Sequence, residues 1–235
     1  MKICIDAGHN HSGADTGAKG RLYLEQDLTF LIADELKKLL KSENHEVIMT
    51  RNSINDNTDT RSLNASLSKR AKIANDNKCD FFISVHINAG GGVGFETYVY
   101  SKSSMAYEKA VKIQDGFRKR GRTDRGVKVA SFYVLKNTNM PSLLVECGFI
   151  DNKDEEKWIM ENYKEIARII ASAFGVNVDT ENEYANKCEA ISVLEKRGII
   201  CEAEKWYHDK WTKTDVEWLL RKMGTYLMWK QKRKG

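Results

Sequence analysis

Proline, paired cysteines and long apolar runs are scarce or missing in this chain of 235 residues. With a single proline, helices and strands must end mainly at glycine, asparagine and capping side chains. The five cysteines are odd in number and form no CxxC pair, which favours reduced thiols over a disulfide scaffold. No apolar run reaches the roughly 20 residues that a membrane helix needs, so we expect no membrane span.

Concentrated charge is also lacking. The chain carries 38 basic and 33 acidic residues, a net charge of +5, of which 12 basic and 9 acidic residues fall in 180–235. A dedicated nucleic-acid binder usually gathers more positive charge on one element, so we expect no nucleic-acid partner. A hydrophobic fraction of 41% excludes a disordered or collagen-like chain and indicates a folded protein.

The first residues leave no room for a secretory signal. The stretch from Met1 reaches the acidic Asp6 after only a few apolar positions, whereas a signal peptide needs a longer apolar core. We therefore expect synthesis in the cytoplasm without a signal peptide.

Short apolar runs alternate with longer amphipathic ones, which predicts an α/β fold, a twisted mostly parallel sheet flanked by helices. The strands are expected near 2–6, 46–50, 80–85, 95–100, 131–136 and 142–147. The helices are expected near 24–42, 61–77, 104–120 and 154–174.

The pattern changes after Gly175. Residues 177–182 are polar and predict a linker between a main domain, 1–176, and a small all-helical domain, 183–235. Four of the five tryptophans lie in this second segment and are expected in its core, because so small a unit needs large side chains. Wall targeting, oligomerisation and simple stabilisation remain open as its role, with targeting favoured.

Three apolar strands run directly into ionisable residues, His9, His86 and Glu146. In parallel α/β sheets the carboxyl ends of the strands line the ligand crevice, so these side chains are expected to converge. One histidine after a strand is weak evidence, because such residues are often simply hydrogen-bonded there. Three coinciding strand ends favour a functional site.

Glu25 precedes a helical pattern at a spacing that places its carboxylate on the apolar face. A buried carboxylate needs partners, either helix N-terminal amides alone or a cation. Two histidines and one carboxylate form a recurring ligand set for a catalytic Zn²⁺ with one open position, and Glu146 would remain to move protons.

At this point the sequence resembles the zinc-dependent N-acetylmuramoyl-L-alanine amidases of the amidase-3 type over roughly 1–175. Several separate motifs carry the resemblance: Ile5-Asp6-Ala7-Gly8-His9, Asp15-Thr16-Gly17-Ala18, Leu24-Glu25-Gln26-Asp27-Leu28, Met49-Thr50-Arg51, Arg70-Ala71-Lys72-Ile73-Ala74-Asn75, Phe82-Ile83-Ser84-Val85-His86-Ile87-Asn88-Ala89 and Pro141-Ser142-Leu143-Leu144-Val145-Glu146-Cys147-Gly148-Phe149.

The resemblance implies a hydrolase that cuts bacterial peptidoglycan between N-acetylmuramic acid and the L-alanine of the stem peptide. It makes His9, Glu25 and His86 the ligands of one Zn²⁺ and Glu146 the catalytic carboxylate. Because such a zinc ion activates water, Glu146 would accept the proton and pass it to the departing amine.

Other residues near these motifs are less specific candidates for the site. Asn88 and Arg51 are candidate substrate contacts, as is Arg125, although a loop turn or a surface position explains them as well. Cys147 invites a thiol-hydrolase interpretation, yet strand neighbours point to opposite faces, so it should face away from the crevice if Glu146 enters it. His11 is an alternative ligand, but the resemblance selects His9.

The missing signal bears on the biological setting. A phage endolysin of a clostridial-type host, made in the host cytoplasm and reaching the wall after membrane permeabilisation, is the first hypothesis. A prophage-derived or sporulation amidase of the bacterium itself is the alternative. A catalytically inactive wall-binding protein of the same fold is a rival hypothesis of a different class. The presence of all four site residues argues against it.

Overall fold

The computed structural model describes residues 1–177 and a few positions between 191 and 219. The chain divides into two compact units, 1–178 and 179–235, and the fold described below is that of the first.

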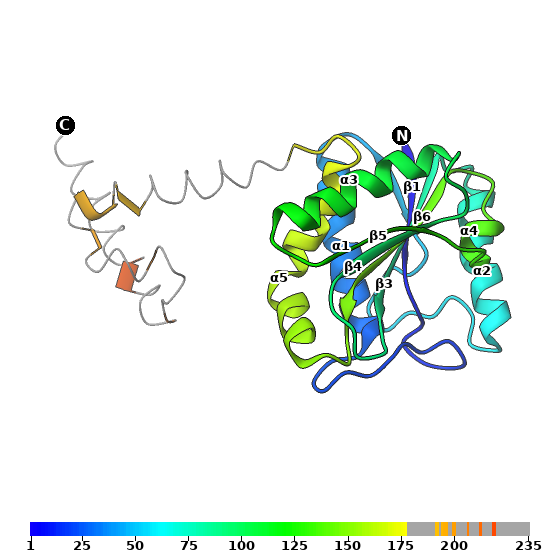
Figure 1. The fold of residues 1–235 in the computed structure, drawn as a ribbon, viewed down its shortest axis with the longest axis horizontal. Coiled ribbons are helices and arrows are strands. Elements are labelled where there is room, and N and C mark those ends of the chain that lie inside the picture. Colours follow the sequence, from blue (N-terminus) through cyan, green and yellow to red (C-terminus); the bar gives the residue numbers. More distant parts are fainter. Residues whose placement is uncertain are drawn as a thin grey trace, which may run out of the picture. The chain divides into compact units, whose positions relative to one another are not determined.

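A six-stranded sheet forms the centre of this unit, in the order β2-β1-β3-β6-β4-β5 (Figure 1). The strands are β1 (Lys2–Ala7), β2 (Glu46–Met49), β3 (Phe81–Asn88), β4 (Phe95–Val99), β5 (Asp124–Val129) and β6 (Ser142–Phe149). The first four strands in spatial order are parallel, whereas β4 pairs antiparallel with β6 and parallel with β5. The prediction of a mostly parallel sheet with flanking helices is thus confirmed.

The helices cover the two faces of the sheet unequally (Figure 1). They are α1 (Glu25–Ser42), α2 (Leu63–Asp76), α3 (Met105–Lys119), α4 (Tyr133–Lys136) and α5 (Lys153–Ser172). The three long helices α1, α3 and α5 pack on one face over the larger apolar core, which includes Ile5 and Ile83. Helices α2 and α4 cover the other face over a smaller core around Phe82 and Leu144. The polar side chains of Asp6, Ser84, His86 and Glu146 alternate onto this second face.

Side-chain caps begin three of the helices. Ser62, Ser104 and Asn152 each accept hydrogen bonds from backbone N–H groups of the first turn of α2, α3 and α5. Such caps satisfy donors that the helix itself leaves unpaired. They agree with the expectation that boundaries in this chain depend on capping residues.

The strand predicted at 131–136 is wrong. The structure has a strand at 124–129, β5, and a single helical turn, α4, at Tyr133–Lys136. The run around Val134 and Leu135 is apolar because one turn of helix buries both side chains against the smaller core. The sequence of β5 is polar because it is an edge strand, whose side chains are mostly half-buried or exposed.

The predicted helical domain at 183–235 and its linker lie mostly outside the described residues. Of the described positions there, Ile191, Ile199 and Ile200 are buried together and pack with Leu194 and Trp206. Among the helices that the structure describes, none is long and apolar enough to cross a membrane.

Candidate metal and hydrolytic site

Three strands deliver His9, His86 and Glu146 to one end of the sheet. His86 in β3 lies directly opposite Glu146 in β6 in the parallel register, so both side chains share a face. His9 follows the end of β1 by two residues and takes a left-handed backbone conformation, with φ of 64°. The preceding Gly8 allows this approach, because a Cβ there would come within 2.6 Å of the His86 imidazole. Parallel strand direction is therefore what assembles this site.

The structure brings His9, Glu25 and His86 together. One potential ligand atom from each lies within 4.8 Å of the others, in the part of the chain that the structure describes. The two imidazoles approach the same oxygen, because His9 Nε2 is 3.1 Å and His86 Nδ1 is 3.2 Å from Glu25 Oε1. Both histidine side chains keep about a fifth of their surface exposed, so the group opens to solvent. His11, the alternative ligand, is exposed and is not part of this group.

Backbone amides fix the Glu25 carboxylate at the start of α1. Its Oε2 accepts a hydrogen bond from the N–H of Ala18 and its Oε1 one from the N–H of Ile87. Burial alone would raise the pKa of Glu25, but hydrogen bonds with His86 and His9 outweigh it and hold the pKa well below its usual value. Glu25 is therefore a fixed anion, and its partners are more than the helix dipole alone.

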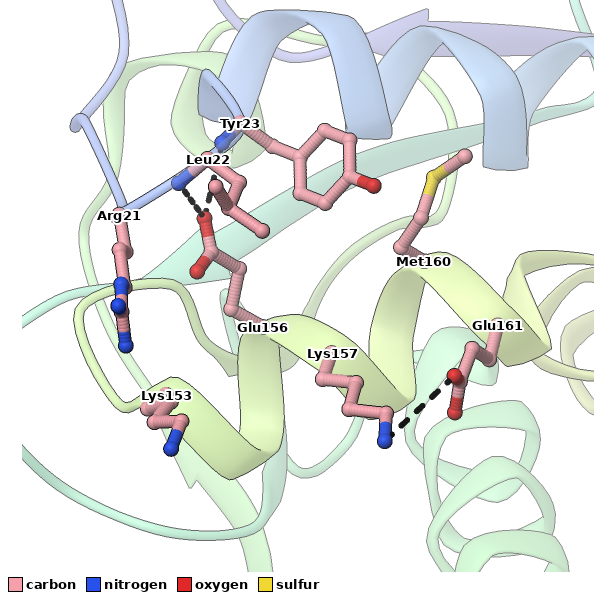
Figure 2. A pocket seen from close by; sticks show the side chains of 8 residues that line it. All are labelled: Arg21, Leu22, Tyr23, Lys153, Glu156, Lys157, Met160 and Glu161. Atoms are coloured by element: carbon pink, nitrogen blue, oxygen red, sulfur yellow. Dashed lines mark hydrogen bonds and ion pairs between the residues drawn. The ribbon is translucent and has the colours of Figure 1, made fainter.

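A buried carboxylate on α5 anchors the loop that leads into Glu25. Glu156 Oε1 accepts hydrogen bonds from the backbone N–H groups of Leu22 and Tyr23, at 2.8 and 2.9 Å (Figure 2). A hollow of about 230 Å³ lies beside this contact, with Tyr23 and Met160 among its lining residues (Figure 2). The loop is thus fixed from two sides, by Glu156 and by Glu25.

A buried ionic network supports His9 from behind. Asp15 Oδ1 lies 3.1 Å from His9 Nδ1, while Asp15 Oδ2 accepts hydrogen bonds from Ser66 and Arg70. Arg70, which is 1% exposed, also forms an ion pair of 2.7 Å with Asp6. Carboxylates behind a ligating histidine commonly set the ring's orientation and tautomer. This role of Asp15 was not predicted, although Asp15 lies in the motif Asp15-Thr16-Gly17-Ala18.

Glu146 faces this group but takes no direct part in it. Its Oε2 oxygen is buried and has no hydrogen-bond partner. Burial raises the pKa of Glu146 to about 7, the nearby carboxylates of Glu25 and Glu96 act in the same direction, and the histidines oppose it. Such a carboxyl group can exchange a proton near neutral pH.

Cys147 points the other way. Its side chain is fully buried in the larger apolar core, on the face of the sheet opposite Glu146. Burial also raises the pKa of its thiol well above the ordinary value, followed by the effects of Glu146 and Glu25. A buried, protonated thiol does not serve as a nucleophile here.

The structure places Arg51 in the interior, where the proposed substrate contact is not available. Its side chain is 1% exposed. The guanidinium donates to four backbone carbonyl groups, those of Ala7, Gly8, Gln26 and Ile54. Buried carbonyl groups of loops, which have no partner in a helix or sheet, need such donors. Arg51 therefore holds the loop that carries His9.

Asn88 lies at the end of β3, and its side chain is engaged within the protein. Its amide Nδ2 donates to Glu96 at 2.9 Å and its Oδ1 accepts from the N–H of Ala89. Arg125 reaches the same carboxylate, with 2.8 Å from Nε to Glu96 Oε2. Glu96, 2% exposed, was not among the predicted residues, although an acidic position inside an apolar strand pattern is a visible signal.

Residues 3–175 match the Amidase_3 family, described as N-acetylmuramoyl-L-alanine amidase. The chain belongs to this family. Among curated relatives of this amidase family, CwlM of Bacillus licheniformis, an N-acetylmuramoyl-L-alanine amidase, is 40% identical over 166 residues, 67% of this chain and 60% of that protein. The endolysin of Bacillus phage SPP1 is 41% identical over 162 residues, 65% of this chain and 56% of the phage protein. The match thus spans somewhat over half the length of these relatives.

Solved amidase structures share the fold. An N-acetylmuramoyl-L-alanine amidase from Clostridium difficile 630 matches 77% of this chain and 97% of its own, with a TM-score of 0.64 and 31% identity. The catalytic domain of the CD27L endolysin, which targets Clostridia Difficile, matches 76% of this chain and 99% of its own, with a TM-score of 0.66 and 28% identity. The family match, residues 3–175, lies in the first unit, which holds all four predicted residues.

Proposed function

We propose that this protein is a zinc-dependent peptidoglycan hydrolase that cleaves the amide between N-acetylmuramic acid and the L-alanine of the stem peptide. The observation that carries the proposal is the convergence of His9, Glu25 and His86 within 4.8 Å beside the unpartnered oxygen of Glu146. Membership of the amidase family supports the substrate class.

The donor set fits one Zn²⁺. Two imidazole nitrogens and one carboxylate oxygen are a known ligand combination for catalytic zinc that leaves a position open. Both imidazoles converge on Glu25 Oε1, and their rings lie 4.7 Å apart at 79°. A cation between these groups would also explain why a carboxylate is fixed at this buried position.

In the proposed mechanism, different residues of the chain transfer protons and position the ligands. When bound, zinc supplies a Lewis acid and lowers the pKa of water toward about 7. Glu146 accepts a proton from the attacking water, whose oxygen forms a bond to the lactyl carbonyl carbon. As the carbon–nitrogen bond breaks, Glu146 returns a proton to the L-alanine nitrogen, which leaves as an amine. Asp15 and Arg70 hold His9 in place throughout.

The biological setting we propose is host cell lysis by a phage endolysin, supported by the 41% identity with the SPP1 endolysin. Such an enzyme is made in the host cytoplasm and meets the wall after the membrane has been permeabilised. The alternative is a lytic amidase of the bacterium, supported by the sporulation-specific N-acetylmuramoyl-L-alanine amidase of Bacillus subtilis at 38% identity over 159 residues. A gene for a membrane-permeabilising protein beside the coding sequence distinguishes the first from the second.

For residues 183–235 we propose attachment to the wall, through peptidoglycan or a secondary wall polymer. Residues 180–235 carry 12 basic and 9 acidic residues, a net charge of +3, and a second contact raises the local concentration of an enzyme on an insoluble polymer. Sedimentation with purified walls tests the proposal, and analytical ultracentrifugation of the free protein tests oligomerisation as the alternative.

An inactive wall-binding protein of the same fold is the rival function. The test incubates purified walls with the full chain and measures newly exposed L-alanine amino groups. Their release supports hydrolysis, whereas binding to walls without release supports the rival. New reducing ends of sugars in place of amino groups would identify a glycosidase instead.

A further inference from the structure

A row of ionisable side chains crosses the sheet beside the proposed catalytic carboxylate. His86 in β3 is paired with Glu146 in β6, and Glu146 is paired with Glu96 in β4. Residues paired across strands share a face of the sheet, so the three side chains lie side by side. The row therefore extends beyond the metal-binding group toward the edge strand β5.

An irregularity in β5 adds two cations to this row. Between the pairs Phe95↔Asp124 and Thr97↔Val127, β4 advances by two residues and β5 by three, as in a β-bulge. Gly126 within it has a φ of 82°, which favours glycine. In a regular strand, residues three apart face opposite sides, but the extra residue lets Arg125 and Lys128 both reach Glu96. Bulges near active sites often redirect a side chain in this way.

These cations exceed the charge of the carboxylate that holds them. Glu96 is 2% exposed and pairs with both Arg125 and Lys128, while Tyr98 and Asn88 donate to it as well. Two cations therefore share a single carboxylate as their ion-pair partner. The Arg125 and Lys128 side chains are 36% and 39% exposed, so their remaining donors reach solvent. Phe149 lies under the Arg125 guanidinium at 4.9 Å and restricts its orientation.

The distance to the reacting bond matches a particular part of the substrate. Strand β5 lies two positions from β6, which corresponds to about 10 Å at about 4.8 Å per strand. An extended peptide covers about 3.5 Å per residue. A group on the residue after L-alanine therefore comes within reach of the long Arg125 and Lys128 side chains when the scissile amide lies at Glu146. In peptidoglycan that residue is D-glutamate joined through its γ-carboxyl group, which leaves its α-carboxyl group free unless it is amidated.

We propose that Arg125 and Lys128 bind the α-carboxylate of the D-glutamate at the second position of the stem peptide. The inference rests on the proposed amidase function, whose leaving group is this peptide. An arginine fork with a neighbouring ammonium group is well suited to a carboxylate. The pair then discriminates between walls with D-glutamate and walls with D-isoglutamine, in which an amide replaces the carboxylate.

The test compares two disaccharide tripeptides that differ only in carrying D-glutamate or D-isoglutamine at the second position. Release of the L-alanine amino group is measured for the zinc-loaded full chain. We expect kcat/KM to favour the acid by about tenfold, the effect of roughly one charge-assisted hydrogen bond. In Arg125→Gln/Lys128→Gln the ratio of kcat/KM between the two substrates should fall to about one, mainly because KM for the acid rises.

A charge-matched control is available on α3. Arg118→Gln/Lys119→Gln removes the same two charges from exposed side chains that pair with Asp115, and it should keep the preference. The double variant could fail to fold because Glu96 loses both of its cations. Adding Glu96→Gln removes the unpaired carboxylate, and this triple variant should fold and lack the preference for the acid. The single variant Arg125→Gln should show a reduced preference for the acid. Equal cleavage of both substrates by the natural protein, or an unchanged preference in the variants, would overturn the inference. Failure of the natural protein to cleave either substrate would instead count against the amidase function.

Discussion

Substitution of Glu146 should abolish hydrolysis and leave metal binding intact. In Glu146→Gln the side chain keeps its size but loses its base, so hydrolysis of wall should fall by about a hundredfold or more. Zinc content should stay at one ion per chain, because the predicted ligands are His9, Glu25 and His86. Metal analysis and the release of amino groups are measured on the same preparation. Loss of zinc with the activity would make Glu146 a ligand and contradict this division of roles.

The pH dependence should report on the same carboxyl group. Burial raises the pKa of Glu146 to about 7, and its base form is the one that accepts a proton from water. Activity is therefore present above this pKa and lost as the pH falls through it. Bound zinc, a nearby positive charge, should move this acid limb of the pH–activity profile to lower pH. In Glu96→Gln a neighbouring negative charge disappears, so the limb of kcat/KM should move to lower pH. A shift to higher pH would contradict the assignment.

At the scale of elements, α2 is tied to β1 by the buried Arg70. Arg70→Met leaves Asp6 and Asp15 buried without their cation, which should cost about 3–5 kcal/mol of unfolding free energy. The pKa values of both aspartates are lowered against the effect of burial, Asp6 largely by Arg70 and Asp15 by His9, Ser66 and Arg70. Their contribution is present above the usual carboxyl pKa and is lost as the pH falls below it. Urea unfolding followed by circular dichroism measures the difference at neutral and acid pH.

A surface pair provides the control for this prediction. Arg61 is 83% exposed on its side chain and pairs with Asp59, so Arg61→Met should leave the urea midpoint unchanged. An equal loss of stability in both variants would show that burial of the Arg70 network is not what stabilises the fold.

The turn after β1 sets the spacing of the two histidines. In Gly8→Ala the new Cβ would meet the His86 ring at 2.5 Å, so affinity for zinc should fall at least tenfold as the ring is displaced. Gly116→Ala is matched in crowding, since its Cβ would meet Ile169 of α5 at 2.7 Å, but Gly116 lies within α3 and not in the turn after β1. It should lower the melting temperature and leave zinc affinity unchanged. Competition with a chromogenic chelator measures both affinities.

The sequence predicts the sheet and the four central residues because each follows a strong local pattern. His9, His86 and Glu146 end or interrupt apolar strands, and parallel direction then brings strand ends together. Strand β5 could not be predicted in the same way, since its residues are half-buried or exposed and form no apolar run. The common face of Arg125 and Lys128 depends on a bulge, which periodicity does not reveal, and the burial of Arg51 depends on loop carbonyl groups distant in sequence.

At the scale of the whole molecule, two compact units divide the proposed tasks. All four predicted site residues lie in 1–178, and the family match ends at residue 175. A chain ending at residue 178 should therefore hydrolyse soluble muropeptides at a rate close to that of the full chain. On intact walls it should be slower if 179–235 attaches the enzyme to its substrate. An equal rate on walls would remove the targeting role, and loss of activity on soluble substrate would make the second unit necessary for catalysis.

The central claim is hydrolysis of the muramoyl–L-alanine amide by a metal held between His9, Glu25 and His86. The most direct measurement treats purified peptidoglycan with the full chain before chelation, after chelation, and after zinc is restored, and identifies the new amino termini. We predict new L-alanine amino termini that disappear with the chelator and return with zinc, and no new reducing ends of sugars. Amino termini that persist without metal, or reducing ends in their place, would contradict the account.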